Sequence, residues 1–109
     1  MKFLIVEDEY ISRSKLEGIL SDFGECTTAK NGSEALLVFE KALLELTPFT
    51  LVTLDIQMPN LNGHAVAVQM RELEEKYKHR CSKILMVTGM TDRMNISSAM
   101  TPGGADGRG

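Results

Sequence analysis

Residues 49–63 read FTLVTLDIQMPNLNG, an apolar run that ends in an acid and passes directly into a turn-rich loop. A short apolar run bounded by turn residues is typical of a strand that is buried on both faces of a sheet. Asp55 stands at the carboxyl end of that run. Open α/β sheets place their chemistry at this edge. The stretch therefore predicts a parallel sheet that presents Asp55 in a site.

A second apolar run, residues 3–6, leads into the acidic sequence Glu7-Asp8-Glu9. Two buried strands would thus carry acids to the same edge of the sheet. Several carboxylates cannot all ionise close together without a cation, and a hard metal that binds oxygen suits them. Glu7, Asp8 and Asp55 are therefore the candidate residues of a metal or phosphoryl site.

Strand-like and helix-like periods alternate along the chain. The expected strands are residues 2–6, 26–29, 50–54 and 83–88. The expected helices are residues 10–23, 33–46 and 63–77, followed by a weaker one that begins at Thr91 or Asp92 and reaches about residue 100. In the third helix the charged residues are expected on a solvated face. They are Arg71, Glu72, Glu74, Glu75, Lys76 and Lys78.

Alternating buried strands and helices imply right-handed crossovers and a parallel sheet that is covered on both faces. We expect a doubly wound α/β fold with strand order 2-1-3-4, whose switch point lies between the first and third strands. Thr88 ends the fourth strand, so its hydroxyl would reach the same pocket as Asp55. Residues 1–101 are expected to form one domain, and the glycine-rich residues 102–109 a loop or tail.

Composition narrows the class of protein. The chain has 109 residues, of which 43% are hydrophobic and 25% charged, as in a soluble globular protein. A net charge of -3 and a pI near 5.3 leave no basic field for nucleic acid or an anionic membrane. No apolar run is long enough for a signal peptide or a membrane span, so we expect a cytoplasmic protein. Cys26 and Cys81 lack CxxC spacing and are expected to be free thiols.

These motifs together resemble a bacterial two-component response-regulator receiver domain, which has a CheY-like, flavodoxin-like fold. The resemblance runs through nearly the whole chain in the family's order. The matching stretches are Ile5-Val6-Glu7-Asp8-Glu9, Asn31-Gly32-Ser33-Glu34-Ala35-Leu36, residues 54–63, Val87-Thr88-Gly89 and Gly104-Ala105-Asp106-Gly107. The Asp-Ile-Gln-Met-Pro segment that begins at Asp55 is the most specific of them.

The resemblance implies that Asp55 is the nucleophile that takes a phosphoryl group from a kinase phosphohistidine, in a domain that is not itself an enzyme. It implies that Mg2+ is held by Glu7, Asp8, Asp55 and the main-chain carbonyl of Gln57. Thr88 would hydrogen-bond a phosphoryl oxygen after transfer and shift the conformation. The implied partner is a histidine kinase or a phosphotransfer protein.

The chain departs from the family pattern at both ends. Glu7 stands where Asp is common, which favours a water-mediated metal contact. The fifth strand and fifth helix of the family are missing or incomplete, Arg108 takes the place of an aromatic residue, and the phosphate-binding lysine has no counterpart. If the chain ends at Gly109, the fourth strand becomes an apolar sheet edge, and a homodimer or larger oligomer is expected.

Two other functions compete with the phosphoacceptor. The first is a phosphorylation-impaired receiver fold that acts as a binding or dimerisation module, because the lysine is missing. The second is a hydrolase of the haloacid-dehalogenase type, which also uses an Asp nucleophile and Mg2+. That family needs a second Asp two residues after the first, and Gln57 stands there, which disfavours the hydrolase.

Overall fold

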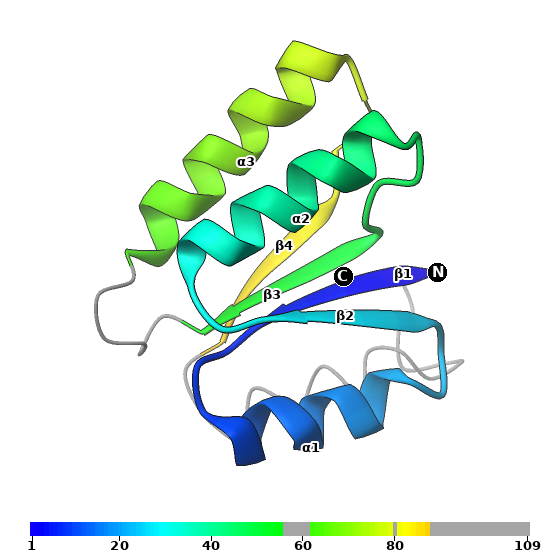
Figure 1. The fold of residues 1–109 in the computed structure, drawn as a ribbon, viewed down its shortest axis with the longest axis vertical. Helices are drawn as coiled ribbons and strands as arrows, with labels where there is room; N and C mark the ends of the chain where they lie inside the picture. Colours follow the sequence, from blue (N-terminus) through cyan, green and yellow to red (C-terminus); the bar gives the residue numbers. More distant parts are fainter. Residues whose placement is uncertain (56–61, 80, 88–109) are drawn as a thin grey trace.

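The computed structural model describes residues 1–55, 62–79 and 81–87, which form a four-stranded parallel sheet with three helices (Figure 1). The elements are β1 (Lys2–Val6), α1 (Tyr10–Leu20), β2 (Glu25–Ala29), α2 (Gly32–Leu44), β3 (Leu51–Asp55), α3 (Gly63–Tyr77) and β4 (Lys83–Val87). The strand order is β2-β1-β3-β4, which confirms the predicted doubly wound topology. The predicted fourth helix and the glycine-rich tail lie outside the described residues.

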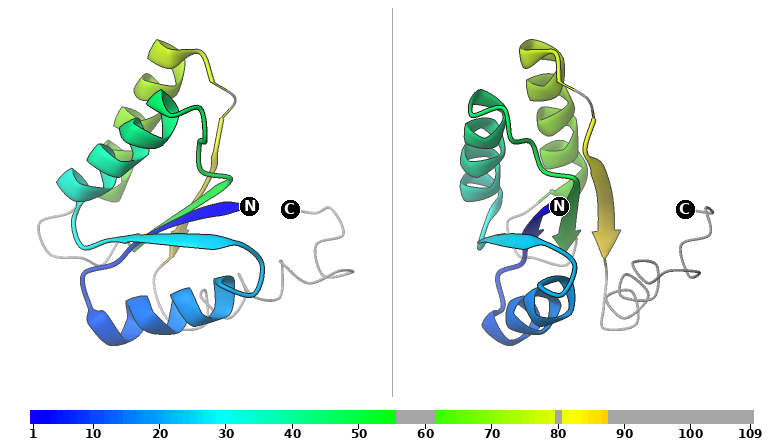
Figure 2. Two further views of the ribbon diagram at one scale, coloured as in Figure 1. Left: turned by 45° about the vertical axis from the view of Figure 1, so that its right-hand side comes forward. Right: turned by 90° about the vertical axis from the view of Figure 1, so that its right-hand side faces the viewer.

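The sheet lies between two helical layers, with α1 on one face and α2 and α3 on the other (Figure 2). Side chains of a strand alternate between the two faces, and the core divides accordingly. Phe3 and Ile5 of β1 pack with Leu16 and Leu20 of α1. Leu4 and Val6, with the matching residues of β3, pack against α2 and α3. A fully buried side chain of this size contributes about 1.5–3 kcal/mol, so β1 anchors both layers.

Asparagine side chains begin two of the helices. Asn31 Oδ1 accepts the main-chain N–H of Glu34 at 2.8 Å at the start of α2, and Asn62 Oδ1 accepts that of Ala65 at 3.1 Å at the start of α3. Each bond satisfies a donor that the helix itself leaves unpaired. With Asn31 as its cap, α2 starts at Gly32, one residue before the expected position.

Two helices end earlier than predicted. α1 ends at Leu20, and the expected last turn is replaced by a tighter bond from Phe23 N to Leu20 O at 2.9 Å. Gly24 then passes against Met1, whose carbonyl oxygen leaves no room for a Cβ at this position. α2 ends at Leu44 because Leu46 adopts a left-handed conformation with φ 62°. Periodicity alone predicts neither stop, because both belong to the connections that follow the helices.

The prediction that all charged residues of α3 face solvent is wrong for Glu74, whose relative exposure is 2%. Its Oε1 lies 2.7 Å from Arg71 Nη1, and its Oε2 accepts the main-chain N–H of Ser82 at 2.6 Å. The Ser82 hydroxyl in turn donates to the carbonyl of Phe49. Glu74 therefore ties α3 to the segments that enter β4 and β3, which makes a charged residue part of the interior.

Candidate functional site

Three predicted site residues meet at one edge of the sheet. Glu7, Asp8 and Asp55 each offer one carboxylate oxygen, and these oxygens all lie within 4.8 Å of one another. Glu7 is 3% exposed and Asp55 is 5% exposed, whereas Asp8 is open to solvent. The cluster therefore has two buried carboxylates and one that faces water.

The strand register explains why the chain brings these acids together. β1 and β3 are parallel neighbours, and Val6 pairs with Leu54 one residue before the acids. Alternate residues of a strand face the same side, and Phe3 and Ile5 face α1. Glu7, two residues after Ile5, is therefore directed to that side. Asp55 follows Leu51 toward the same face by the same alternation. A parallel pair in this register must place both side chains at its carboxyl edge.

Hydrogen bonds organise the loop between β1 and α1. The main-chain N–H of Glu7 donates to Ala29 O at 3.0 Å, which extends the sheet by one residue. The main-chain N–H of Glu9 donates to Glu7 Oε2 at 3.4 Å, and Ser12 Oγ donates to Glu9 Oε1 at 2.6 Å. The Glu9 side chain thus contacts α1, whereas its main-chain N–H contacts the cluster through Glu7.

Arg13, which no sequence motif singles out as a site residue, reaches the same loop with its side chain. Arg13 Nη1 donates to the carbonyl oxygens of Glu7 at 2.9 Å and Asp8 at 3.3 Å. The guanidinium also lies over the ring of Tyr10, 5.6 Å from its centroid. A cation one turn into a helix that follows an acidic loop is a signal that could have drawn attention to it.

The three carboxylates suit a divalent cation. All donors are hard oxygen atoms, as Mg2+ requires. Opposite oxygens of an octahedral Mg2+ site are separated by about 4.2 Å, twice the Mg–O distance of about 2.1 Å. The spacing of up to 4.8 Å in the cluster is close to this value. The exposed position of Asp8 leaves one side for water or a second reactant.

Two predicted site residues, Gln57 and Thr88, lie outside the described residues. The structure describes β4 as far as Val87, which pairs with Asp55 in the register of β3 and β4. The roles expected for Gln57 and Thr88 therefore remain predictions.

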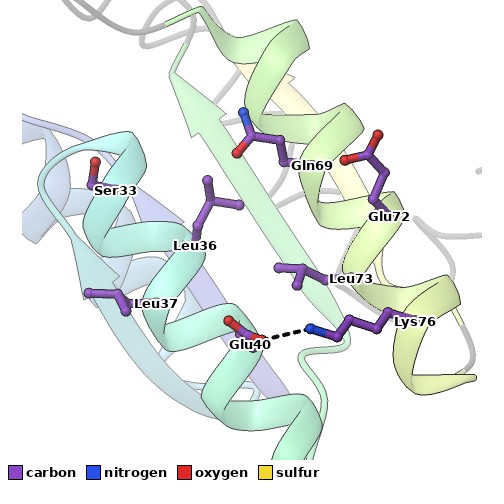
Figure 3. A pocket seen from close by; sticks show the side chains of 8 residues that line it. All are labelled: Ser33, Leu36, Leu37, Glu40, Gln69, Glu72, Leu73 and Lys76. Carbon is purple, nitrogen blue, oxygen red and sulfur yellow. Dashed lines mark ion pairs between the residues drawn. The ribbon is translucent and has the colours of Figure 1, made fainter.

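A groove of about 510 Å3 lies between α2 and α3, and none of the three carboxylates lines it (Figure 3). At one end, Tyr77 Oη donates to Glu40 Oε2 at 2.6 Å, and Lys76 Nζ lies 4.0 Å from the same oxygen. The hydrogen bond to Glu40 raises the pKa of Tyr77. The lining residues are Ser33, Leu36, Leu37, Glu40, Gln69, Glu72, Leu73 and Lys76. The groove provides a concave surface that is partly apolar, whereas the carboxylates that could bind a metal ion lie in the acidic cluster.

Among the helices of the described residues, none combines the length and apolar character that a membrane span requires.

Known proteins are similar to this chain over most of its length. A family model described as response regulator receiver domain matches residues 3–107. The chain is 31% identical over 108 residues to the chemotaxis protein CheY of Listeria monocytogenes, which covers 97% of this chain and 82% of that protein. Three probable transcriptional regulators also match, but the matched part spans only 28% to 34% of their length.

Solved structures of known proteins are also similar to this chain in three dimensions. The receiver domain of the histidine kinase CKI1 from Arabidopsis thaliana, solved in complex with Mg2+, matches with 26% identity and a TM-score of 0.70. That match covers 85% of this chain and 73% of that chain. A complex of the histidine kinase ThkA with the response regulator protein TrrA matches with 36% identity and a TM-score of 0.63, over 81% of this chain and 68% of that chain.

Proposed function

Because this chain belongs to the response regulator receiver domain family, we propose that Asp55 is its phosphoacceptor. The chain is thus a receiver domain of two-component phosphorelay signalling. The observation that carries the assignment is the acidic cluster, in which buried Asp55 ends β3 beside Glu7 and Asp8. Among the strands of the described residues, β3 alone has an acid as its last residue.

The proposed transfer forms one bond and breaks one. A carboxylate oxygen of Asp55 attacks the phosphorus of a phosphohistidine, the P–N bond breaks, and the imidazole leaves with its electron pair. The product on Asp55 is an acyl phosphate. Burial holds Asp55 in one orientation, and the solvent side of Asp8 leaves room for the approach of the donor.

Glu7, Asp8 and Asp55, together with the main-chain carbonyl of Gln57, would hold a Mg2+ ion. The ion would neutralise the negative charge that gathers when a phosphoryl group approaches a carboxylate. The solved Mg2+ complex of a similar receiver domain supports this choice of metal. Thr88 is proposed to donate its hydroxyl to a phosphoryl oxygen after transfer.

The proposed partner is a histidine kinase or a phosphotransfer protein. A solved complex of a histidine kinase with a response regulator contains a chain similar to this one, which supports the proposal. The domain is proposed to act as a cytoplasmic phosphoacceptor without enzymatic activity of its own. Binding of nucleic acid or membrane is not expected from a net charge of -3. Self-association, expected if β4 forms an edge, remains a prediction.

Mass spectrometry after incubation with a small phosphodonor and Mg2+ tests the assignment. The wild-type protein should gain one phosphoryl mass that hydroxylamine removes, because hydroxylamine cleaves acyl phosphates. Asp55→Asn should gain none, and Asp22→Asn, which changes an exposed acid, should behave as wild type. If wild type gains no mass, the domain is the phosphorylation-impaired binding module. If Asp55→Asn is labelled as fully as wild type, the nucleophile is assigned wrongly.

A further inference from the structure

Arg13 donates hydrogen bonds to three consecutive carbonyls of the loop that carries the acidic residues. Its main-chain N–H donates to Glu9 O at 2.9 Å. Its side-chain Nη1 donates to Glu7 O at 2.9 Å and to Asp8 O at 3.3 Å. One residue on the first turn of α1 therefore satisfies every carbonyl between the end of β1 and the start of the helix.

These bonds act on the orientation of the acids. A carbonyl held in one direction fixes the plane of its peptide bond, and two fixed planes in sequence fix the direction of the side chain between them. Asp8 lies between the planes that Arg13 holds through the Glu7 and Asp8 carbonyls. Glu7 is held on its other side by the bond from its N–H to Ala29. The loop backbone is thus constrained at both residues that face Asp55.

We propose that Arg13 is a positioning residue that orients Glu7 and Asp8 for a divalent cation. The inference rests on the proposed function, in which these residues hold Mg2+. Partners that orient metal ligands typically change metal affinity by about 10- to 100-fold when they are removed. In this role Arg13 orients the main chain of the metal ligands Glu7 and Asp8 and does not itself bind the cation or the phosphoryl group.

The charge of Arg13 and its positioning role predict opposite changes in Mg2+ affinity when Arg13 is removed. A guanidinium close to a cation site repels the cation, so charge alone predicts that removal of Arg13 tightens Mg2+ binding. Loss of the side-chain bonds to the Glu7 and Asp8 carbonyls predicts the opposite, because the acids then sample orientations in which they cannot share one ion. The direction of the change therefore separates the two roles.

Calorimetric titration with Mg2+ tests the proposal on wild type, Arg13→Ala, Arg13→Lys and Lys15→Ala. Lys15 is an exposed cation of the same helix, so its removal is a matched change of charge. Arg13→Ala should weaken Mg2+ binding by about 10-fold. Arg13→Lys, which keeps one donor on a flexible stem, should recover part of this loss. Lys15→Ala should bind Mg2+ as wild type does, or slightly more tightly.

Hydrogen exchange without metal supplies the second readout. The main-chain N–H of Glu9 donates to Glu7 Oε2, and it should exchange faster in Arg13→Ala than in Lys15→Ala if the loop is released. Equal or tighter Mg2+ binding by Arg13→Ala, or unchanged exchange at Glu9, would overturn the positioning role. A wild-type protein that binds no Mg2+ would instead overturn the proposed function. The two failures are therefore distinguishable.

Discussion

Asp55→Asn should remove most of the stabilisation that Mg2+ gives the domain. The carboxylates of Glu7 and Asp55 are both buried, and their oxygens lie within 4.8 Å. Two unit charges at that separation repel by about 3.5 kcal/mol at an effective dielectric constant of about 20. A bound cation relieves this repulsion in wild type, whereas the neutral amide both removes it and offers a weaker ligand. The free energy of unfolding of the variant should therefore rise little when Mg2+ is added.

Linkage sets the size of the effect. A ligand at ten times its dissociation constant adds about 1.4 kcal/mol to the free energy of unfolding, and at a hundred times about 2.7 kcal/mol. For a domain of about 100 residues, each kcal/mol raises the Tm by about 4 °C or more. Wild type should therefore gain at least about 5 °C in saturating Mg2+, and Asp55→Asn should gain less than a third of that.

Thermal unfolding followed by circular dichroism measures the difference. Low salt is required because screening weakens the contribution of exposed Asp8. NaCl at matched ionic strength controls for screening, and Asp22→Asn controls for the loss of an exposed acid. The reasoning is refuted if Mg2+ raises the Tm of Asp55→Asn as much as that of wild type, or if NaCl reproduces the effect in wild type.

Glu74→Gln should lower the free energy of unfolding by about 2 kcal/mol in urea titration, because a neutral amide cannot replace both buried bonds of the carboxylate. The exposed neighbour variant Glu75→Gln should change it little, and equal losses would contradict a role in the interior. Asn62→Ala should cost about 1 kcal/mol through loss of the helix cap, and Asn62→Asp should restore it in the same titration. Burial raises the pKa of Cys26, so at mildly alkaline pH a disulfide reagent should label exposed Cys81 first. Equal labelling rates would count against that order.

Local patterns were enough to predict most elements and the architecture. The strand at residues 2–6 and the helix at residues 63–77 agree with β1 and α3 at both ends, because side-chain periodicity is a local property. Buried strands that alternate with helices allow few right-handed topologies, so the strand order also followed. Acids directly after buried strands must lie at the carboxyl edge, which is why Glu7, Asp8 and Asp55 could be predicted as neighbours.

Contacts between distant segments decided what periodicity could not. In the sequence, Glu74 looks like one more charge on a solvent-exposed helix face. Only the approach of Ser82, from the segment that enters β4, makes it a buried hydrogen-bond acceptor. Arg13 stands one turn into the helix that follows the acidic loop, but only the packing of α1 shows that its guanidinium reaches the carbonyls of Glu7 and Asp8. The sequence by itself determined which acids share an edge, because strand ends are read locally. The tertiary structure decided which polar groups hold them and which are buried, because hydrogen bonds and burial depend on partners that packing brings together.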